Sequence, residues 1–348
     1  MSRCKLEEFI SYEQPSKYIV DSDQYDDSFE IPVLTAGKSF ILGYTDETNN
    51  IFDNLPVIIF DDFTTSVQFV DFPFKVKSSA MKLLKNTEQA DIKYCYYLLK
   101  YLQHTPENHK RQWLSTTSQK TVELPVIEEQ KNIVSKLDKI LEVIDNQNKQ
   151  LELLDEAIKA RFVEMFGDPV SNSKDLPVQK MNNVAPICQY DGSFEESVWL
   201  LNLDMVESQT GRIINYNIVS KDEIGGSVCT FDENNVLYSK LRPYLNKVVI
   251  PNGKGYATSE LVPLRPDPKI INRIYLAYLL RSNEFVEMIK EKVAGAKMPR
   301  VSMSDFREFN VPVPPLELQN QFASFVKEID KSRLLSNHSL FLIKSITF

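Results

Sequence analysis

Two basic stretches hold the residues whose types and spacing suit contact with phosphate groups. Four lysines lie in the eleven residues from Lys75 to Lys85, with no acidic side chain among them. Three lysines and one arginine lie in the fifteen residues from Lys240 to Lys254, again without an acid. In a chain with a formal net charge of −8, such basic islands fit local phosphate contact, with an affinity that depends steeply on salt. The alternative is that each stretch is a solvated surface that binds nothing.

Motifs for catalysis or for holding a cofactor are missing from the sequence. There is no Asn/Asp-Pro-Pro-Tyr/Phe motif of adenine methylases, no glycine-rich loop to cradle a cofactor and no Gly-x-x-x-x-Gly-Lys-Ser/Thr phosphate loop. The four cysteines lack C-x-x-C spacing, and the three histidines complete no metal-ligand set. We therefore expect no catalytic residue and no metal, and we expect Asp61 and Asp62 to be acids that end a strand at the surface.

The chain also lacks signals for export or membrane insertion. It has no run of 18 or more apolar residues, and its N-terminus has no signal-peptide core. These features predict a cytoplasmic protein with reduced thiols and no contact with a membrane.

A repeated sequence motif indicates which structural elements position the basic residues. Leu124–Gln130 aligns without a gap on Val313–Gln319, which lies 189 residues later. Each copy reads apolar, proline, apolar, acid and glutamine, and each opens a stretch with heptad-spaced apolar residues. This period is far longer than the roughly 20–50 residues of a solenoid repeat, so it predicts a duplicated module of a globular domain followed by a long helix.

The stretch after residue 127 predicts a long helix with a coiled-coil seam. Its apolar residues alternate steps of four and three over more than four heptads, with Gln147 and Arg161 as polar seam positions that could set the register. Gly167 and Pro169 should end this helix, which would span roughly 50 Å. We predict antiparallel pairing with the second helix, where Arg333 also falls on the seam. The apolar seam positions are Ile133, Leu137, Ile140, Ile144, Leu151, Leu154 and Ile158 in the first helix, and Phe322, Val326 and Ile329 in the second.

In both globular parts the sequence predicts the same order of elements, strands followed by an amphipathic helix. We predict strands at 57–60, 67–72, 235–240 and 246–250, with Arg242 and Pro243 in the turn between the last two. The predicted helices are 91–103 and 272–289, and their tyrosines and leucines match in spacing.

Three segments carry a resemblance to a known family. They are the two helix-opening motifs, Leu124–Gln130 and Val311–Gln319, and the helix-closing segment Glu164–Pro169. Val236–Pro243 adds a fourth, similar to a strand and loop of target-recognition domains. In order, spacing and duplication the chain resembles the specificity (S) subunit of Type I restriction–modification systems, and the resemblance covers essentially its whole length.

This resemblance implies an α+β fold with a pseudo-two-fold duplication. Two mixed α/β target-recognition domains are separated and joined by two long helices that form an antiparallel coiled coil. We expect target-recognition domain 1 at residues 1–123, a central conserved helix at 124–168, target-recognition domain 2 at 169–312 and a conserved, shortened C-terminal helix at 313–348.

The resemblance also implies a function without chemistry of its own. Each domain would read one half of a bipartite site in double-stranded DNA, and the helices would fix the gap between the half-sites. The helices would also dock two methylation (M) subunits, and restriction (R) subunits would join the assembly. S-adenosylmethionine and ATP would be bound by those partners, which methylate adenine at N6 and cleave DNA, so no cofactor is expected on this chain.

Within that reading, the DNA contacts should come from basic and hydroxyl side chains, because lysine and arginine supply charge while serine and threonine are short donors. For each of these residues, and above all for Tyr244, ordinary surface or packing roles are the alternative. In the first domain the candidates are Thr64, Thr65, Lys75, Lys77, Ser78, Ser79, Lys82, Lys85, Lys110, Arg111 and Thr116. In the second domain they are Ser239, Lys240, Arg242, Tyr244, Lys247, Lys297 and Arg300.

Other functions leave different traces in the sequence. A methylase fused to a specificity domain would need cofactor motifs, and a plain coiled-coil scaffold would need neither basic islands nor duplicated globular parts. A truncated or silent S-subunit variant that acts as a regulator or scaffold shares the fold and stays open. We expect the shortened second helix to weaken assembly, or to be compensated by the M subunits or another S chain, because part of the first helix's apolar seam would lack a partner.

Overall fold

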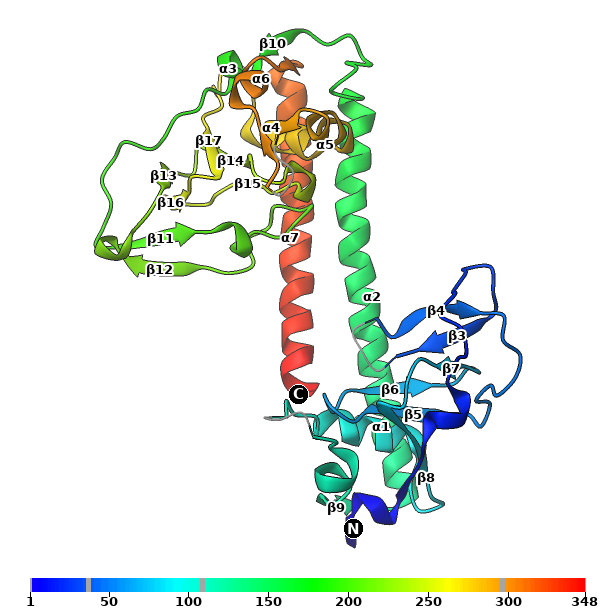
Figure 1. Ribbon diagram of the computed structural model, residues 1–348. Helices are drawn as coiled ribbons and strands as arrows, with labels where there is room; N and C mark the ends of the chain where they lie inside the picture. The colour runs from blue at the N-terminus through cyan, green and yellow to red at the C-terminus, as the bar shows by residue number, and fades with distance from the viewer. Residues whose placement is uncertain (1, 36–38, 107–109, 295–297, 348) are drawn as a thin grey trace. The chain divides into compact units, whose positions relative to one another are not determined.

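The computed structural model describes residues 2–35, 39–106, 110–294 and 298–347, and these form two compact units (Figure 1). The first unit comprises Met1–Asn146 and Phe341–Phe348, and the second comprises Gln147–Leu340. Each unit therefore holds one globular part together with segments of the two long helices, α2 (Ile127–Phe166) and α7 (Leu316–Thr347). No helix in the described ranges is long and apolar enough to cross a membrane.

The globular part of the first unit is built from three small sheets and one helix. The largest sheet has the strand order β2-β8-β5-β6 and is antiparallel throughout, and α1 packs on it. A second sheet has the order β4-β3-β7, and β1 pairs with β9. The elements are β1 (Ser2–Lys5), β2 (Ile10–Glu13), β3 (Ile31–Leu34), β4 (Ile41–Thr45), β5 (Val57–Asp61), β6 (Val67–Val70), β7 (Lys75–Val76), β8 (Met81–Asn86), α1 (Ile92–Tyr101), a π-helical turn (Trp113–Thr117) and β9 (Thr121–Leu124).

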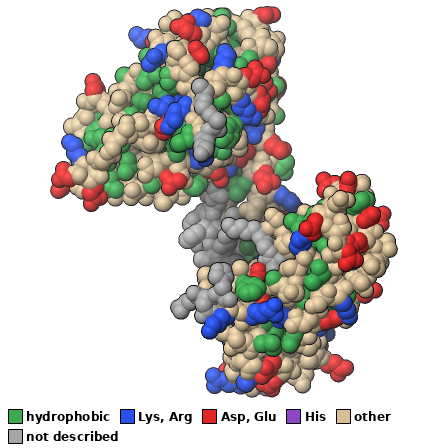
Figure 2. All heavy atoms as spheres, in the orientation of Figure 1, with side chains coloured by type: hydrophobic (Ala, Val, Ile, Leu, Met, Phe, Trp, Pro, Cys, Tyr) green, Lys and Arg blue, Asp and Glu red, His purple; other side chains and the backbone are tan. Residues whose placement is uncertain are grey.

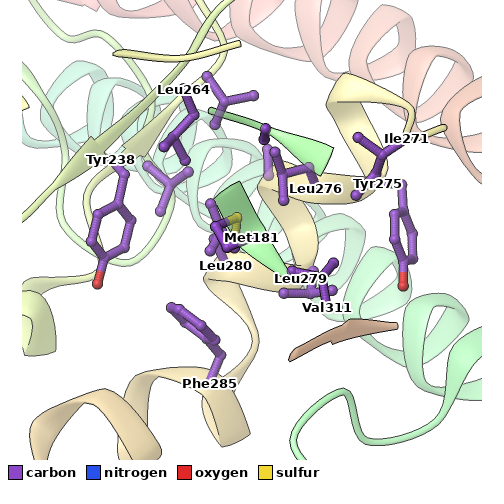
Figure 3. Close-up of a cluster of buried hydrophobic side chains, with 14 of the residues drawn as sticks. Met181, Tyr238, Leu264, Ile271, Tyr275, Leu276, Leu279, Leu280, Phe285 and Val311 are labelled. Atoms are coloured by element: carbon purple, nitrogen blue, oxygen red, sulfur yellow. The ribbon is translucent and has the colours of Figure 1, made fainter. Parts of the chain in front are cut away.

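The globular part of the second unit has sheets with the orders β12-β11-β16-β13 and β15-β14-β17, and two-stranded pairs β10-β20 and β18-β19. Its core joins the second of these sheets to the helices, as the cluster around Tyr238, Tyr275 and Phe285 shows (Figure 3). The elements are β10 (Val178–Lys180), α3 (Met181–Val184), β11 (Ser197–Leu201), β12 (Asn217–Ser220), β13 (Val228–Phe231), β14 (Val236–Ser239), β15 (Val248–Val249), β16 (Gly255–Thr258), β17 (Leu261–Leu264), α4 (Arg273–Arg281), α5 (Asn283–Lys290), β18 (Val293–Ala294), β19 (Arg300–Val301), α6 (Met303–Arg307) and β20 (Asn310–Pro312).

The duplication extends to strand order and register. Strands β6-β5-β8 of the first unit correspond to β15-β14-β17 of the second, and all four pairings are antiparallel. Ile58 lies opposite Leu84 in the first sheet, and Val236 lies opposite Leu264 in the second. Each globular part is closed by a strand that pairs with the strand just before a long helix, β1 with β9 and β10 with β20.

A buried glutamine connects each long helix to its globular part in the same way. The Gln130 side-chain oxygen accepts from the backbone N–H of Asp91 at 2.8 Å, and its amide donates to the carbonyls of Gln89 and Pro125. Both Gln130 and its counterpart in α7 are fully buried. The shared glutamine of the repeated motif is thus a structural clamp at the start of α1 and of α4.

Gln319 makes the matching set of bonds in the second unit. Its oxygen accepts from Asn272 N–H at 2.6 Å, and its amide donates to the carbonyls of Ile270 and Pro314. Asn272 is also the N-cap of α4, just as Asp91 is the N-cap of α1. Each glutamine therefore holds the backbone of the N-cap residue, Asp91 of α1 or Asn272 of α4, whose own side chain caps the first turn of that helix.

The long helices follow the predicted heptad pattern. Every predicted apolar seam position of α2 is buried or half-buried, and Ile158 joins Phe322 and Val326 in the core of the second unit. Within that unit α2 and α7 run antiparallel, because Asp155 meets Arg333 while Phe162 lies 5.5 Å from Phe322, ring centroid to centroid. Gly167 ends α2 with φ = 70°, as the sequence predicted, and a side chain there would clash with Ser173.

Two predicted features of the helices need correction. The single helix predicted at 272–289 is two helices, α4 and α5, because Ser282 leaves the helical conformation and caps α5 through Phe285 N–H. Arg161 is half-buried and pairs with Glu164 on its own helix, so its ion pair does not fix the register against α7. The fold class of two duplicated mixed α/β domains with long helices is confirmed.

Candidate nucleic-acid interface

The duplicated sheets place equivalent turns in the two units, and several candidate residues lie on them. In the first unit the turn joins β5 to β6, and in the second it joins β14 to β15. Asp62 N–H donates to Ala80 and its carbonyl accepts from Gln112; Lys240 N–H donates to Glu260 and its carbonyl accepts from Val301. Asp62 and Lys240 therefore occupy the same position, and in each unit a later segment of the chain pairs with the turn.

In the second unit this pairing brings Lys240, Arg242 and Arg300 together. The Arg242 N–H donates to the Pro299 carbonyl at 2.8 Å, and Leu241 forms an isolated β-bridge with Arg300. Arg242 is exposed and has φ = 49°, a left-handed conformation that is uncommon without glycine. Such local strain is typical of functional loops, and here it directs an exposed arginine out of the turn.

Neighbouring side chains complete this surface, which we call face 2: Lys240, Arg242, Tyr244, Met298 and Arg300. Tyr244 is 40% exposed, so its side chain is not buried by packing as the alternative role would require. Met298 is 47% exposed. Arg300 forms a two-pronged ion pair with Glu260, which lowers the pKa of that carboxyl and leaves the arginine half-exposed. Space-filling atoms show lysine and arginine side chains among apolar ones on the visible side of this unit (Figure 2).

The corresponding surface of the first unit, face 1, consists of Thr64, Lys110, Arg111 and Thr116, all exposed. The Asp62 carboxylate accepts from Trp113 N–H at 2.8 Å, which holds the segment after Arg111 against the turn. Arg111 directly precedes Gln112 in the pairing with Asp62, as Arg300 precedes Val301 in the pairing with Lys240. The two arginines are also 189 residues apart, the spacing of the helix-opening motifs.

Four predicted DNA contacts lie in the interior and need correction. Lys75 is fully buried and pairs with Glu47 at 2.7 Å, while Lys82 is 1% exposed, pairs with Asp62 at 3.2 Å and donates to Gln14. The hydroxyls of Thr65 and Ser239 are buried and bonded to backbone carbonyls of His104 and Leu241. Both residues of β7 and the first four residues of β8 are buried, and a charge buried in this way must be paired.

The expected surface position of Asp61 and Asp62, at the end of β5, was also wrong. Asp61 is 8% exposed and Asp62 is 1% exposed, so they do not lie at the surface. Asp61 accepts from the N–H groups of Phe63 and Thr64 and shapes the turn. The structure gives both acids a role in supporting face 1, and no group of metal-ligating side chains occurs in the described parts of the chain.

The remaining candidates are reachable from solvent but are partly engaged. Lys85 donates to the Pro56 carbonyl and Lys247 to the Leu203 carbonyl, and burial lowers the pKa of both ammonium groups. Lys77 pairs with Asp23, which raises the lysine's pKa. Ser78 is exposed and Ser79 half-buried, and they directly precede Ala80, whose carbonyl accepts from Asp62 N–H in the turn after β5. Lys297 lies outside the described residues.

Sequence reasoning missed some side chains at these faces. Leu114, three residues after Arg111, is 55% exposed, and Met298, two residues before Arg300, is 47% exposed. Exposed apolar side chains next to arginines could have marked the segments after 100 and 297, because an exposed apolar residue beside cations suits a nucleic-acid surface.

Comparison with known proteins adds the decisive observation. A family model described as the Type I restriction modification DNA specificity domain matches residues 3–156 and again 204–343. The chain belongs to this specificity-domain family. The two matches fall on the two copies of the duplicated module.

Individual members of the family resemble parts of the chain. The specificity subunit of the Type I restriction enzyme EcoR124I/EcoR124II from Escherichia coli is 46% identical over 146 residues, 40% of this chain and 36% of that subunit. The EcoDI specificity subunit from Escherichia coli is 27% identical over 124 residues, 36% of this chain and 27% of that subunit. The aligned part thus spans about a third of the length of these relatives.

Solved structures agree with the fold. The S subunit of a Type I restriction-modification system from M. genitalium matches with a TM-score of 0.57 at 13% identity, over 99% of this chain and 93% of that one. A chain from a study of complex assembly and conformational transition of the type I R-M system matches with the same TM-score at 14% identity, over 99% of this chain and 95% of that one. At these identities the likeness concerns the fold.

Proposed function

We propose that this chain is a DNA-reading specificity subunit of a Type I restriction–modification complex. Target-recognition domain 1 (1–123) reads one half of a bipartite site through face 1, and target-recognition domain 2 (169–312) reads the other half through face 2. The helices space the half-sites and dock two methylation subunits, which restriction subunits join. Catalysis, S-adenosylmethionine and ATP belong to those partners, and the chain itself acts without a catalytic group.

The observation that carries this proposal is the equivalence of faces 1 and 2. Two copies of one sheet present two turns, each paired with a segment that bears an exposed arginine, Arg111 or Arg300. Their surroundings differ, because Lys240 takes the place of Asp62 and the second turn is longer. Equal architecture with unequal side chains is what reading two different half-sites requires, since base-edge contacts specify sequence and phosphate contacts position the protein.

Arg242→Ala is expected to impair reading of the second half-site and leave the first unchanged. Arg242 is exposed at the tip of face 2, and a good arginine contact to a base is worth about 1–3 kcal/mol, or roughly 5- to 150-fold. The measurement is N6-adenine methylation of DNA libraries in which one half-site at a time is randomised, with the methylation subunit present.

Two further variants give this experiment its controls. Arg111→Ala should produce the reverse pattern, relaxing the first half-site alone. Arg307→Ala, an exposed arginine on α6 outside face 2, should change neither. Equal methylation of both half-sites by Arg242→Ala would rule out face 2 as the reading surface.

A further inference from the structure

A cluster of charged side chains within the second unit links three elements through one carboxylate. Asp155 lies on α2, Arg333 on α7, and Arg212 in the loop between the short turn after β11 and strand β12. One oxygen of Asp155 accepts from Arg333, and the other accepts from Arg212 at 3.2 Å. Asp155 is thus shared between the two helices and the globular domain.

The Arg333 side chain is largely buried, so the stability of the fold depends on the acidic groups that pair with it. It is 9% exposed, pairs with Asp330 at 3.0 Å as well as with Asp155, and its Nε has no hydrogen-bond partner among the described residues. A charge in this position costs stability unless it is paired, and removal of a partner is strongly destabilising. An apolar residue would fit the seam better, so the arginine contributes specificity of pairing more than stability.

The pairing distinguishes one register of the two helices from its neighbours. Seven residues before and after Asp155 on α2 stand Asn148 and Phe162. If α7 slipped by one heptad in either direction, Arg333 would face one of these instead of a carboxylate. Either slip would remove the acidic partner on α2 and leave Arg333 with only Asp330 of its own helix, whereas the apolar seam positions alone would tolerate it.

The same carboxylate fixes the globular domain to the helices. Arg212 also binds Glu207 at 2.9 Å, and Thr210 donates to that acid, so the loop is a rigid turn. Gly211 has φ = 66° and lies so close to the Val248 carbonyl on β15 that any side chain would clash. Strand β15 borders the turn that carries face 2, so the position of this loop is coupled to the position of face 2.

The first half of the chain has no equivalent of this arrangement. By the spacing of the duplicated motifs, Arg333 corresponds to Ile144 and Asp155 to Lys344. The cavity of about 550 Å³ beside the cluster is also no ligand site of the usual kind, since its arginines are already paired with its acids or, for Arg281, bonded to Val248.

From these observations we propose that Asp155 is a positioning residue that sets the gap between the DNA half-sites. It holds α7 in one register against α2 through Arg333, and it holds target-recognition domain 2 on the helices through Arg212. This inference rests on the proposed function, and it assigns spacing specificity to a polar contact in the second unit rather than to helix length alone.

The test compares Asp155→Asn and Arg333→Gln, singly and together, in the full chain with its methylation subunit. The readout is methylation of DNA that carries both half-sites at the preferred gap and at gaps one base pair shorter or longer. We expect the preference for the correct gap to fall by about tenfold in each single variant, and no further in the double variant, because the residues act as a pair. Glu164→Gln, which breaks an exposed pair on the same helix, should keep the full preference.

The outcomes separate this inference from the proposed function. If the unaltered chain directs no methylation at any two-part site, the proposed function fails. If it does so with one gap, and folded Asp155→Asn keeps that gap preference, the role of Asp155 is refuted. Should Asp155→Asn not fold, Arg212→Gln, which leaves Arg333 paired and changes a 38% exposed side chain, must still relax the gap preference, and an unchanged preference would refute the inference.

Discussion

Lys82→Met is expected to lower the free energy of unfolding of the first unit by about 3–5 kcal/mol, because it leaves a buried carboxylate without its cation. Lys82 and Asp62 are each 1% exposed, and Asp62 also anchors Trp113 N–H next to face 1. The effect should appear as a shift in the urea midpoint. Trp113 reports it by fluorescence in a Trp199→Phe background, since these are the two tryptophans of the chain.

The double variant Lys82→Met/Asp62→Asn provides the matched comparison. It removes both charges but keeps an oxygen that accepts from Trp113 N–H, so it should regain much of the lost stability. Lys85→Met changes a less buried lysine of the same strand and should cost under about 1 kcal/mol. A stable Lys82→Met variant with weakened DNA binding would contradict the structural role and restore the phosphate contact predicted from sequence.

Gln319→Leu and Gln130→Leu are each expected to destabilise their own unit by about 3 kcal/mol or more. Each substitution removes the hydrogen bonds of three buried or part-buried backbone groups, and a buried group without a partner costs about 1–3 kcal/mol. Trp113 fluorescence should register the change at Gln130, and Trp199 fluorescence the change at Gln319. Single-tryptophan backgrounds separate the two signals.

An exposed glutamine of the same helix serves as the control for these variants. Gln150→Leu on α2 should alter stability by no more than about 0.5 kcal/mol. Wild-type stability of either clamp variant would show that the repeated glutamine is not what joins the helix to its domain.

The heptad spacing and the repeated motif allowed the long helices and the duplication to be predicted from the sequence. Steps of four and three are a local property of the chain, so the seam from Ile133 to Ile158 was readable, and Gly167 marked the end of α2. The break at Ser282 was not readable from periodicity, because apolar residues continue on the same face on both sides of the cap.

The candidate site was harder to predict, because burial of a lysine depends on partners far along the chain. Lys75 and Lys82 look like Lys77 in sequence, yet Glu47 and Asp62 hold them inside while Lys77 is 35% exposed. Arg242 and Arg300 are 58 residues apart, and they lie on one face because Leu241 pairs with Arg300 and Arg242 N–H donates to the Pro299 carbonyl. Thr64 and Thr65 are adjacent in one turn, yet Thr64 is exposed and Thr65 is buried, so a place in a turn does not decide exposure either.

The central claim is that two faces of one chain read two parts of one DNA site. Its most direct test is the methylome of a methylation-free host that expresses this chain with its methylation subunit, sequenced by a method that detects N6-methyladenine. The account predicts one two-part motif with a fixed gap and a methylated adenine in each half. An absence of methylation, with soluble protein and a methylation subunit that is active with another specificity subunit, would contradict it and favour the silent or regulatory variant.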